Sequence, residues 1–128
     1  MAKKILLVED EIPAIDIYEK VLGKAGFEIK SLTSGKEALS ELRKIKHQEK
    51  ARPDLILLDL ILPDVNGIEI LREIKSWRET RDIPVVILTN YKDVETEQRG
   101  EELGANAYII KTNITPPEIV GIVRKYLN

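Results

Sequence analysis

The sequence contains no cysteine, and aromatic residues make up only 5% of its 128 positions. The absence of cysteine excludes disulfides, thiol catalysis and zinc-thiolate sites. No apolar run approaches the roughly 18 residues that cross a bilayer, and the residues before Ile5 are too few for a signal peptide. Neither sign of charge dominates, since the formal net charge is −2, so no bulk attraction favours nucleic acid or an anionic membrane. We therefore expect a cytoplasmic protein that directly contacts neither nucleic acid nor a membrane.

The composition that remains is typical of a globular protein, with 43% hydrophobic and 33% charged residues. A length of 128 residues suits one domain with a core of its own. No linker, repeat or low-complexity stretch interrupts the chain, and its last amphipathic stretch runs to Tyr126. We expect a single domain over residues 1–128, with no output domain.

Five short apolar runs alternate with amphipathic stretches along the chain. The runs are Ile5–Val8, Phe27–Leu32, Leu55–Leu58, Val85–Leu88 and Tyr108–Ile110. Four of them are continuously apolar, which is typical of strands buried on both faces of a parallel sheet. The run Phe27–Leu32 mixes polar and apolar residues, so we expect it at an edge of the sheet.

Helix-start signals stand between these runs. They are Pro13 in a first turn, Ser34 with Glu37 as a capping box, Asn66, Asp93, and Thr115 followed by Pro116. Strict alternation of strand and helix predicts an α/β fold, in which helices cover both faces of a parallel sheet through right-handed crossovers.

Polar residues follow four of the predicted strands, at the edge where parallel sheets form their sites. They are Glu9-Asp10-Glu11, Asp59, Thr89-Asn90 and Lys111. Converging carboxylates repel one another unless a cation lies among them, and oxygen ligands without histidine or cysteine favour Mg²⁺. A lysine and a threonine hydroxyl can hold phosphate oxygens. The set suits a phosphoryl group on a nucleophile, and Asp59 is placed to be both metal ligand and nucleophile.

In order and spacing, four fragments resemble the receiver domains of two-component response regulators, including the chemotaxis regulators. The fragments are residues 5–11 (ILLVEDE), 54–67 (DLILLDLILPDVNG), 84–89 (PVVILT) and 104–111 (GANAYIIK). The resemblance covers essentially the whole chain. It implies a doubly wound, flavodoxin-like sheet of five parallel strands in the order 2-1-3-4-5, with five helices.

The resemblance also implies roles for the polar residues. Asp59 resembles the phosphoacceptor, and Thr89 and Lys111 resemble the pair that holds the phosphoryl oxygens. The metal ligands implied for Mg²⁺ are Asp10 and Asp59 directly, Glu9 through water, and the backbone carbonyl of Ile61. The implied partners are a sensor histidine kinase, a phosphotransfer protein or a small phosphodonor, and a downstream protein that the sequence does not name. The domain would be no enzyme beyond its own phosphorylation and dephosphorylation.

A switch is implied as well. Phosphorylation would draw Thr89 toward the new charge, Tyr108 would fill the vacated space, and the face of the fourth helix, fifth strand and fifth helix would change. The fourth helix contains Gly100, which costs roughly 1 kcal/mol relative to alanine. We therefore expect this helix to be marginally stable before phosphorylation.

Two residues depart from the family pattern. Thr112 stands where the family usually has proline, so we expect a trans bond and a rearranged loop that shifts Lys111. Asn90 stands where a small residue is usual and narrows access to the site. Ile61 and Tyr91, two residues after the acceptor and after Thr89, are expected to shield the acyl phosphate and slow its hydrolysis.

Other functions stay open to different degrees. A phosphorylation-independent pseudo-receiver scaffold is the main alternative, because Asn90 and Thr112 depart from the pattern. An aspartyl phosphohydrolase would need a second aspartate where Ile61 stands. A flavin or dinucleotide carrier would need a phosphate-binding loop after the first strand, where residues 9–12 are acidic instead.

Overall fold

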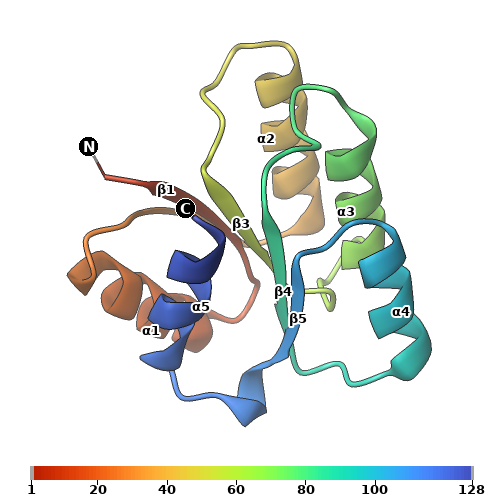
Figure 1. The fold of residues 1–128 in the computed structure, drawn as a ribbon. Helices are drawn as coiled ribbons and strands as arrows, with labels where there is room; N and C mark the ends of the chain where they lie inside the picture. The colour runs from red at the N-terminus through yellow and green to blue at the C-terminus, as the bar shows by residue number, and fades with distance from the viewer. Residues whose placement is uncertain (1, 128) are drawn as a thin grey trace.

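The structure is a computed structural model that describes residues 2–127. Its elements, in chain order, are β1 (Lys4–Val8), α1 (Ile12–Lys24), β2 (Glu28–Leu32), α2 (Gly35–Lys46), β3 (Leu55–Leu58), α3 (Gly67–Ser76), β4 (Val85–Thr89), α4 (Val94–Glu102), β5 (Ala107–Ile110), a 3₁₀ helix η1 (Lys111–Asn113) and α5 (Glu118–Tyr126). Within the described range, the strands form one five-stranded sheet in the order β2-β1-β3-β4-β5, and all neighbouring strands are parallel. This confirms the fold that the resemblance implied (Figure 1).

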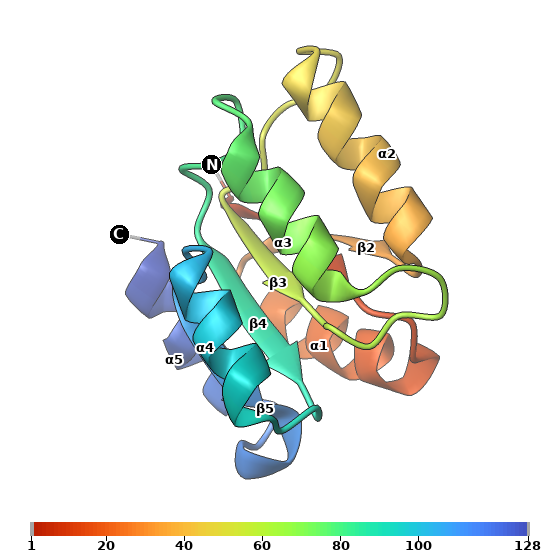
Figure 2. The same ribbon diagram turned by 90° about the vertical axis from the view of Figure 1, so that its right-hand side faces the viewer.

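Helices cover both faces of the sheet, as Figures 1 and 2 show. The helices α1 and α5 lie on one face, and α2, α3 and α4 lie on the other. Side chains of a strand alternate between the two faces, so β3 contributes Ile56 and Leu58 to one core and Leu55 and Leu57 to the other. Each of these four residues is fully buried, which explains why central strands are continuously apolar.

The two edge strands differ from the central ones. The predicted edge position of β2 is confirmed, and its residues alternate between exposed and less exposed. The expectation of burial on both faces is wrong for β5, whose four residues are all only half-buried. The reason is its place in the sheet, because β5 pairs with β4 along one side and is the opposite edge.

The predicted caps of α2, α3 and α4 are confirmed by hydrogen bonds from backbone N–H groups to side-chain oxygens. The pairs are Glu37 to Ser34 (3.1 Å), Ile68 to Asn66 (2.9 Å) and Thr96 to Asp93 (3.0 Å). Pro13 also lies in the first turn of α1, as predicted. Local sequence signals therefore set where these helices begin.

The start of α5 was predicted too early. Thr115 and Pro116 precede the helix in a turn, and α5 begins at Glu118 with Pro117 as its N-cap. The backbone N–H of Thr115 donates to the carboxylate of Glu118 at 2.8 Å. The cap by Thr115 that the sequence suggested is therefore absent, because α5 has no side-chain cap hydrogen bond and the hydroxyl of Thr115 instead donates to Glu118.

Helix α4 lies on the sheet through a glycine. Of the nine described residues of α4, Gly100 alone is buried. A Cβ atom at this position would lie 2.9 Å from Cδ1 of Ile87 in β4. Gly100 therefore allows a close approach of helix and sheet, besides lowering the helix propensity of the segment. Throughout residues 2–127, no helix combines the length and apolar character that a membrane crossing requires.

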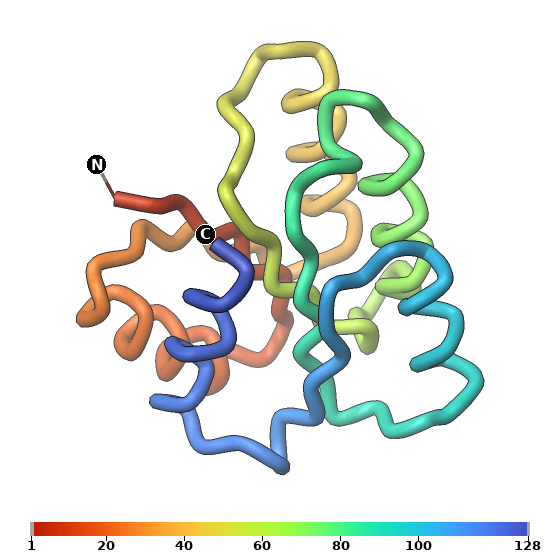
Figure 3. The backbone as a smooth tube through the Cα atoms, viewed as in Figure 1, coloured from red at the N-terminus to blue at the C-terminus, as the bar shows by residue number. Residues whose placement is uncertain are grey.

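The chain path in Figure 3 shows how the loops that follow β1, β3, β4 and β5 gather at the same end of the sheet. This end is where the sequence placed its polar residues. The fold therefore provides the geometric condition that the predicted site requires.

Candidate functional site

One hollow lies at the carboxyl ends of the central strands. It is lined by Asp10, Glu11, Asp59, Ile61, Thr89, Asn90, Tyr91 and Lys111, and we call it the acidic hollow. The structure therefore brings together polar residues that lie up to about a hundred positions apart in the chain, as expected for the ends of parallel strands.

Three carboxylates meet at the acidic hollow. Glu9, Asp10 and Asp59 each offer an oxygen atom within 4.8 Å of the others. Glu9 and Asp59 are buried, with exposed fractions of 1% and 5%, and Asp10 is half-buried. The group is made of oxygen donors at close range, which fits a hard divalent cation rather than a soft one.

Lys111 provides positive charge to this group. Its Nζ donates to Asp59 Oδ2 at 2.9 Å and to Glu9 Oε1, and it lies 3.9 Å from Glu11 Oε1. Burial lowers the pKa of Lys111, but the hydrogen bonds and charges of Glu9 and Asp59 outweigh burial, so the pKa is raised. The ammonium is therefore held in its charged form and offsets part of the negative charge of the three carboxylates that it faces.

The pKa of Glu9 shifts in the opposite sense to that of an ordinary ion-paired carboxylate. Burial raises the pKa of Glu9, and the hydrogen bond from Lys111 only partly offsets this effect. The negative charge of Asp59 raises it further. Lys111 thus does not fully offset the cost of burying the charge of Glu9. A cation beside the three carboxylates would reduce the repulsion between their negative charges.

A chain of hydrogen bonds joins Thr89 to Tyr108. Thr89 is fully buried, and its hydroxyl accepts the backbone N–H of Tyr91 at 3.2 Å. The carbonyl of Tyr91 in turn accepts the hydroxyl of Tyr108. Burial, followed by the charges of Glu97 and Asp93, raises the pKa of Tyr108 to about 12. The two predicted switch residues are therefore linked through the loop between β4 and α4.

The two departures from the family pattern contact each other. The backbone N–H of Thr112, which a proline would lack, donates to Oδ1 of Asn90 at 3.2 Å. The bond between Lys111 and Thr112 is trans, as predicted, like every peptide bond in the described range. With this loop in place, the Nζ of Lys111 donates to Oδ2 of Asp59 at 2.9 Å.

Gly67 is a residue of the site that sequence reasoning missed. Its N–H donates to the carbonyl of Leu60 at 2.9 Å. A Cβ atom there would lie 2.5 Å from Cα of Leu60 and 2.6 Å from the carbonyl oxygen of Asp59. Asp59 Oδ1 also accepts the N–H of Ile61 at 3.1 Å. The first turn of α3 thus closes directly onto the segment that carries Asp59, and a glycine after an N-cap was the available signal.

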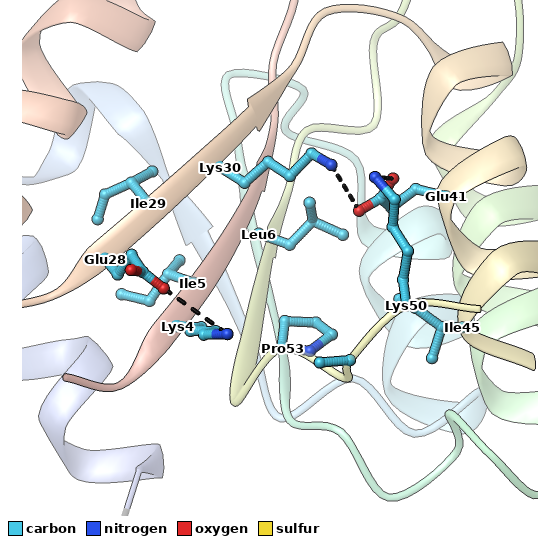
Figure 4. Close-up of a pocket in the computed structure, with 11 residues that line it drawn as sticks. Lys4, Ile5, Leu6, Glu28, Ile29, Lys30, Glu41, Ile45, Lys50 and Pro53 are labelled. Carbon is cyan, nitrogen blue, oxygen red and sulfur yellow. Dashed lines mark hydrogen bonds and ion pairs between the residues drawn. The ribbon is translucent and has the colours of Figure 1, made fainter. Parts of the chain in front are cut away.

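A second, more apolar hollow lies elsewhere, beside the edge strand β2 (Figure 4). Its floor includes Leu6, and its lysines are already paired with carboxylates. Lys30 and Lys50 contact Glu41 at 2.9 Å and 3.2 Å (Figure 4). Because its charges satisfy one another, this hollow resembles a packed surface groove and does not compete with the acidic hollow as a reactive site.

The comparison with known families agrees with the geometry. Residues 5–124 match the family described as "Response regulator receiver domain". The chain belongs to this family. Receiver domains are signalling modules that histidine kinases phosphorylate and that act on downstream targets.

The chain is also similar to part of a longer regulatory protein. The phosphate regulon transcriptional regulatory protein PhoB of Escherichia coli (strain K12) is 39% identical over 124 residues, which cover 97% of this chain and 51% of PhoB. The receiver chain thus spans about half the length of PhoB.

Two solved structures resemble the receiver domain closely. The Mn²⁺-bound response regulator Rcp1 superposes with a TM-score of 0.88 at 33% identity, covering 98% of this chain and 95% of Rcp1. The phosphorylated cyanobacterial phytochrome response regulator RcpA has a TM-score of 0.84 at 35% identity, covering 98% of this chain and 91% of RcpA.

Proposed function

We propose that this receiver domain takes a phosphoryl group onto Asp59, with Mg²⁺, from a histidine kinase, a phosphotransfer protein or a small phosphodonor. The phosphorylated domain then changes the face formed by α4, β5 and α5, and it signals by contact of this face with a separate downstream protein. On this proposal the domain turns over no external substrate.

The observation that carries the proposal is the meeting of Asp10, Asp59, Thr89 and Lys111 in one hollow. Phosphoryl transfer needs a nucleophile, positive charge around the phosphoryl oxygens, and positioning. Asp59 is the buried carboxylate that both Lys111 and the N–H of Ile61 contact. The Mn²⁺-bound Rcp1 and the phosphorylated RcpA add support, since both are similar receiver structures.

In the transfer step, a carboxylate oxygen of Asp59 attacks the phosphorus atom of the donor. A P–O bond to Asp59 forms as the P–N bond of a phosphohistidine, or the P–O bond of acetyl phosphate, breaks. The electron pair of the broken bond leaves with the imidazole or the acetate. Lys111 lies 2.9 Å from Oδ2 of Asp59, so its ammonium can move onto a phosphoryl oxygen, and the hydroxyl of Thr89 can donate to another.

The residues proposed to hold Mg²⁺ are Asp10 and Asp59 directly, Glu9 through water, and Ile61 through its backbone carbonyl. When bound, the ion supplies positive charge that offsets the carboxylates and the phosphoryl oxygens. The support is the oxygen-donor cluster of Glu9, Asp10 and Asp59 and the raised pKa of Glu9, which burial causes first.

The proposed switch uses the hydrogen bonds from Thr89 to Tyr108. If the hydroxyl of Thr89 turns toward a phosphoryl oxygen, the N–H of Tyr91 loses its acceptor. The loop between β4 and α4 is then free to move, and with it the carbonyl that holds the hydroxyl of Tyr108. Because Tyr108 lies in β5 beside α4, its movement changes the face that a partner would contact.

The test is incubation of the protein with acetyl phosphate and MgCl₂, followed by intact-mass measurement. We expect an adduct of about 80 Da, the mass of one phosphoryl group, and its loss in Asp59→Asn, because the nucleophile is gone. Asp82→Asn, which changes an exposed carboxylate outside the acidic hollow, serves as the control and should keep the adduct. If the unsubstituted protein did not form the adduct, the result would instead support a phosphorylation-independent pseudo-receiver scaffold.

A further inference from the structure

Helix α2 is capped by a residue from a distant loop. The N–H groups of Gly35, Lys36 and Glu37 have no carbonyl partner inside the helix, because they lie in its first turn. Ser34 Oγ accepts the N–H of Glu37 at 3.1 Å. The carboxylate of Asp64 accepts the other two, with Oδ1 2.8 Å from the nitrogen of Gly35 and Oδ2 3.0 Å from that of Lys36.

The contact between this loop and the helix is tight as well as polar. Asp64 belongs to residues 59–66, which connect β3 to α3. A Cβ atom on Gly35 would lie 2.6 Å from Cβ of Val65 and 3.1 Å from Oδ1 of Asp64. The loop and the start of α2 therefore fit each other closely, and a negative carboxylate at a helix N-terminus is favourable.

The same loop carries the groups proposed to hold the metal ion. At one end, Asp59 Oδ1 accepts the N–H of Ile61. At the other, Gly67 closes onto Leu60. Between these ends, Asp64 is the side chain that hydrogen-bonds to another helix.

We propose that Asp64 is a positioning residue: by capping α2 it fixes the β3–α3 loop so that the carbonyl of Ile61 and the carboxylate of Asp59 keep the arrangement that binds a divalent cation. The proposal rests on the proposed metal site. Only two residues separate Ile61 from Asp64, and three residue steps of extended chain span at most about 11 Å. If the hydrogen bonds of Asp64 to α2 are lost, the backbone at Ile61 is therefore no longer held in one position.

The test is a titration of the ¹⁵N-labelled, unphosphorylated protein with MgCl₂, followed through backbone amide resonances. In the parent protein we expect the amides of Asp59 and Ile61 to shift with added Mg²⁺, and those of Gly35 and Lys36 to shift along the same binding curve. In Asp64→Ala we expect the Kd for Mg²⁺ to rise about tenfold, the lower end of the range for residues that orient metal ligands. Asp64→Asn, which keeps one acceptor oxygen, should lie between the two.

Two further variants separate positioning from simple helix capping. Ser34→Ala removes the other side-chain cap of the same helix turn, and the side-chain hydrogen bonds of Ser34 are with Glu37 and not with the loop. It should therefore lower the urea midpoint as Asp64→Ala does and leave the Kd unchanged. Gly35→Ala pushes on Val65 from the helix side, so it should raise the Kd although Asp64 is intact. If Gly35→Ala does not fold, the comparison of Asp64→Ala with Ser34→Ala decides.

The outcomes distinguish this proposal from the proposed function. An unchanged Kd in Asp64→Ala, or an equal rise in Ser34→Ala, would overturn the positioning role while leaving the metal site intact. A parent protein whose Asp59 and Ile61 amides do not respond to Mg²⁺ would overturn the metal site and the positioning role together.

Discussion

At the residue scale, Gly67 shows how little space surrounds the backbone of Asp59 and Leu60. Its missing side chain would lie 2.5 Å from Cα of Leu60 and 2.6 Å from the carbonyl oxygen of Asp59. Both are backbone atoms, which cannot rotate away as the end of a side chain can. We expect Gly67→Ala to lower the free energy of unfolding by about 3 kcal/mol, the upper part of the usual cost of overpacking, as measured by urea denaturation.

Gly121 in α5 provides the matched control for Gly67. Among the described residues, a Cβ atom at Gly121 would meet no heavy atom within 4 Å apart from those of its chain neighbours and of its own helix backbone. Because alanine has the higher helix propensity, Gly121→Ala should raise the free energy of unfolding by about 0.5–1 kcal/mol. If Gly67→Ala and Gly121→Ala changed the free energy of unfolding equally, helix propensity would determine the effect at Gly67, and contact with the backbone of Asp59 and Leu60 would not.

Ile61 is expected to affect the lifetime of the proposed phosphorylated form. It lines the acidic hollow, and 56% of its surface is exposed, so an apolar side chain stands where water would approach an acyl phosphate on Asp59. We expect Ile61→Asn to speed hydrolysis about tenfold, equivalent to about 1.4 kcal/mol of barrier, because an amide can orient the attacking water. Intact-mass measurement of the phosphorylated protein over time gives the rate.

Val94 is the control for Ile61. It is an exposed apolar residue at the start of α4, and it is not among the residues that line the acidic hollow. Val94→Asn should leave the hydrolysis rate unchanged. If Ile61→Asn also left the rate unchanged, Ile61 would not be the residue that shields the acyl phosphate.

At the scale of the elements, α4 and α5 have equal length but different anchoring. Each has nine residues. Among the described residues, α4 buries only Gly100, whereas α5 buries Ile119 and Val123 completely. Burial of one such side chain is worth about 1.5–3 kcal/mol. In the unphosphorylated protein we therefore expect amides in α4 to exchange with solvent deuterium about 100-fold faster than those in α5.

Hydrogen exchange resolved by residue tests this difference directly. The comparison uses amides in the last two turns of each helix, where intrahelical hydrogen bonds protect them from exchange. Equal protection in the two helices would contradict the marginal stability of α4 and would remove the reason for regarding it as the soft part of the proposed switching face.

The elements themselves were predictable where one local signal dominates. Continuous apolar runs mark the buried strands, so the predicted and observed strands agree to within one residue at each end. Side-chain caps at Ser34, Asn66 and Asp93 were equally readable. The start of α5 was not, because Thr115, which with Pro116 suggested a helix start, instead donates to Glu118 in the turn before the helix. The half-buried state of β5 depends on strand order and not on its own composition.

At the scale of the whole molecule, the sequence predicted which residues meet but not what holds the loops in place. Parallel strands bring their carboxyl ends to one edge, so residues at those ends could be expected together. The contacts of Asp64 with α2 and of Asn90 with Thr112 join positions 28, 29 and 22 residues apart. These contacts depend on how the loops are placed relative to one another, and the periodicity of apolar residues in the sequence does not predict that placement.

The pH dependence of stability is also a property of the whole molecule. Four carboxylates at or near helix starts have lowered pKa values, in each case first because of a hydrogen bond that they accept. They are Glu37, Asp64, Asp93 and Glu118. A carboxylate with a lowered pKa in the folded state contributes stability above its unfolded pKa, and this contribution is lost as the pH falls through the folded pKa. The buried Glu9 acts in the opposite direction, because its pKa is raised.

Asp93 isolates this effect, since it accepts both the N–H and the hydroxyl of Thr96. Asn is as good an N-cap as neutral Asp, so Asp93→Asn removes the charge and keeps the cap. We expect the parent to be more stable than Asp93→Asn at pH 7. The difference between their free energies of unfolding should disappear as the pH falls below 3.8, the ordinary pKa of this carboxyl. Glu49→Gln changes the net charge equally at a position outside the helices and serves as the control for net charge. Urea denaturation from pH 7 to pH 2 measures the free energy of unfolding of all three proteins. If the difference in this free energy between the parent and Asp93→Asn stayed constant over this range, a role for the charge of Asp93 would be contradicted, because titration of that carboxyl should make the two proteins converge.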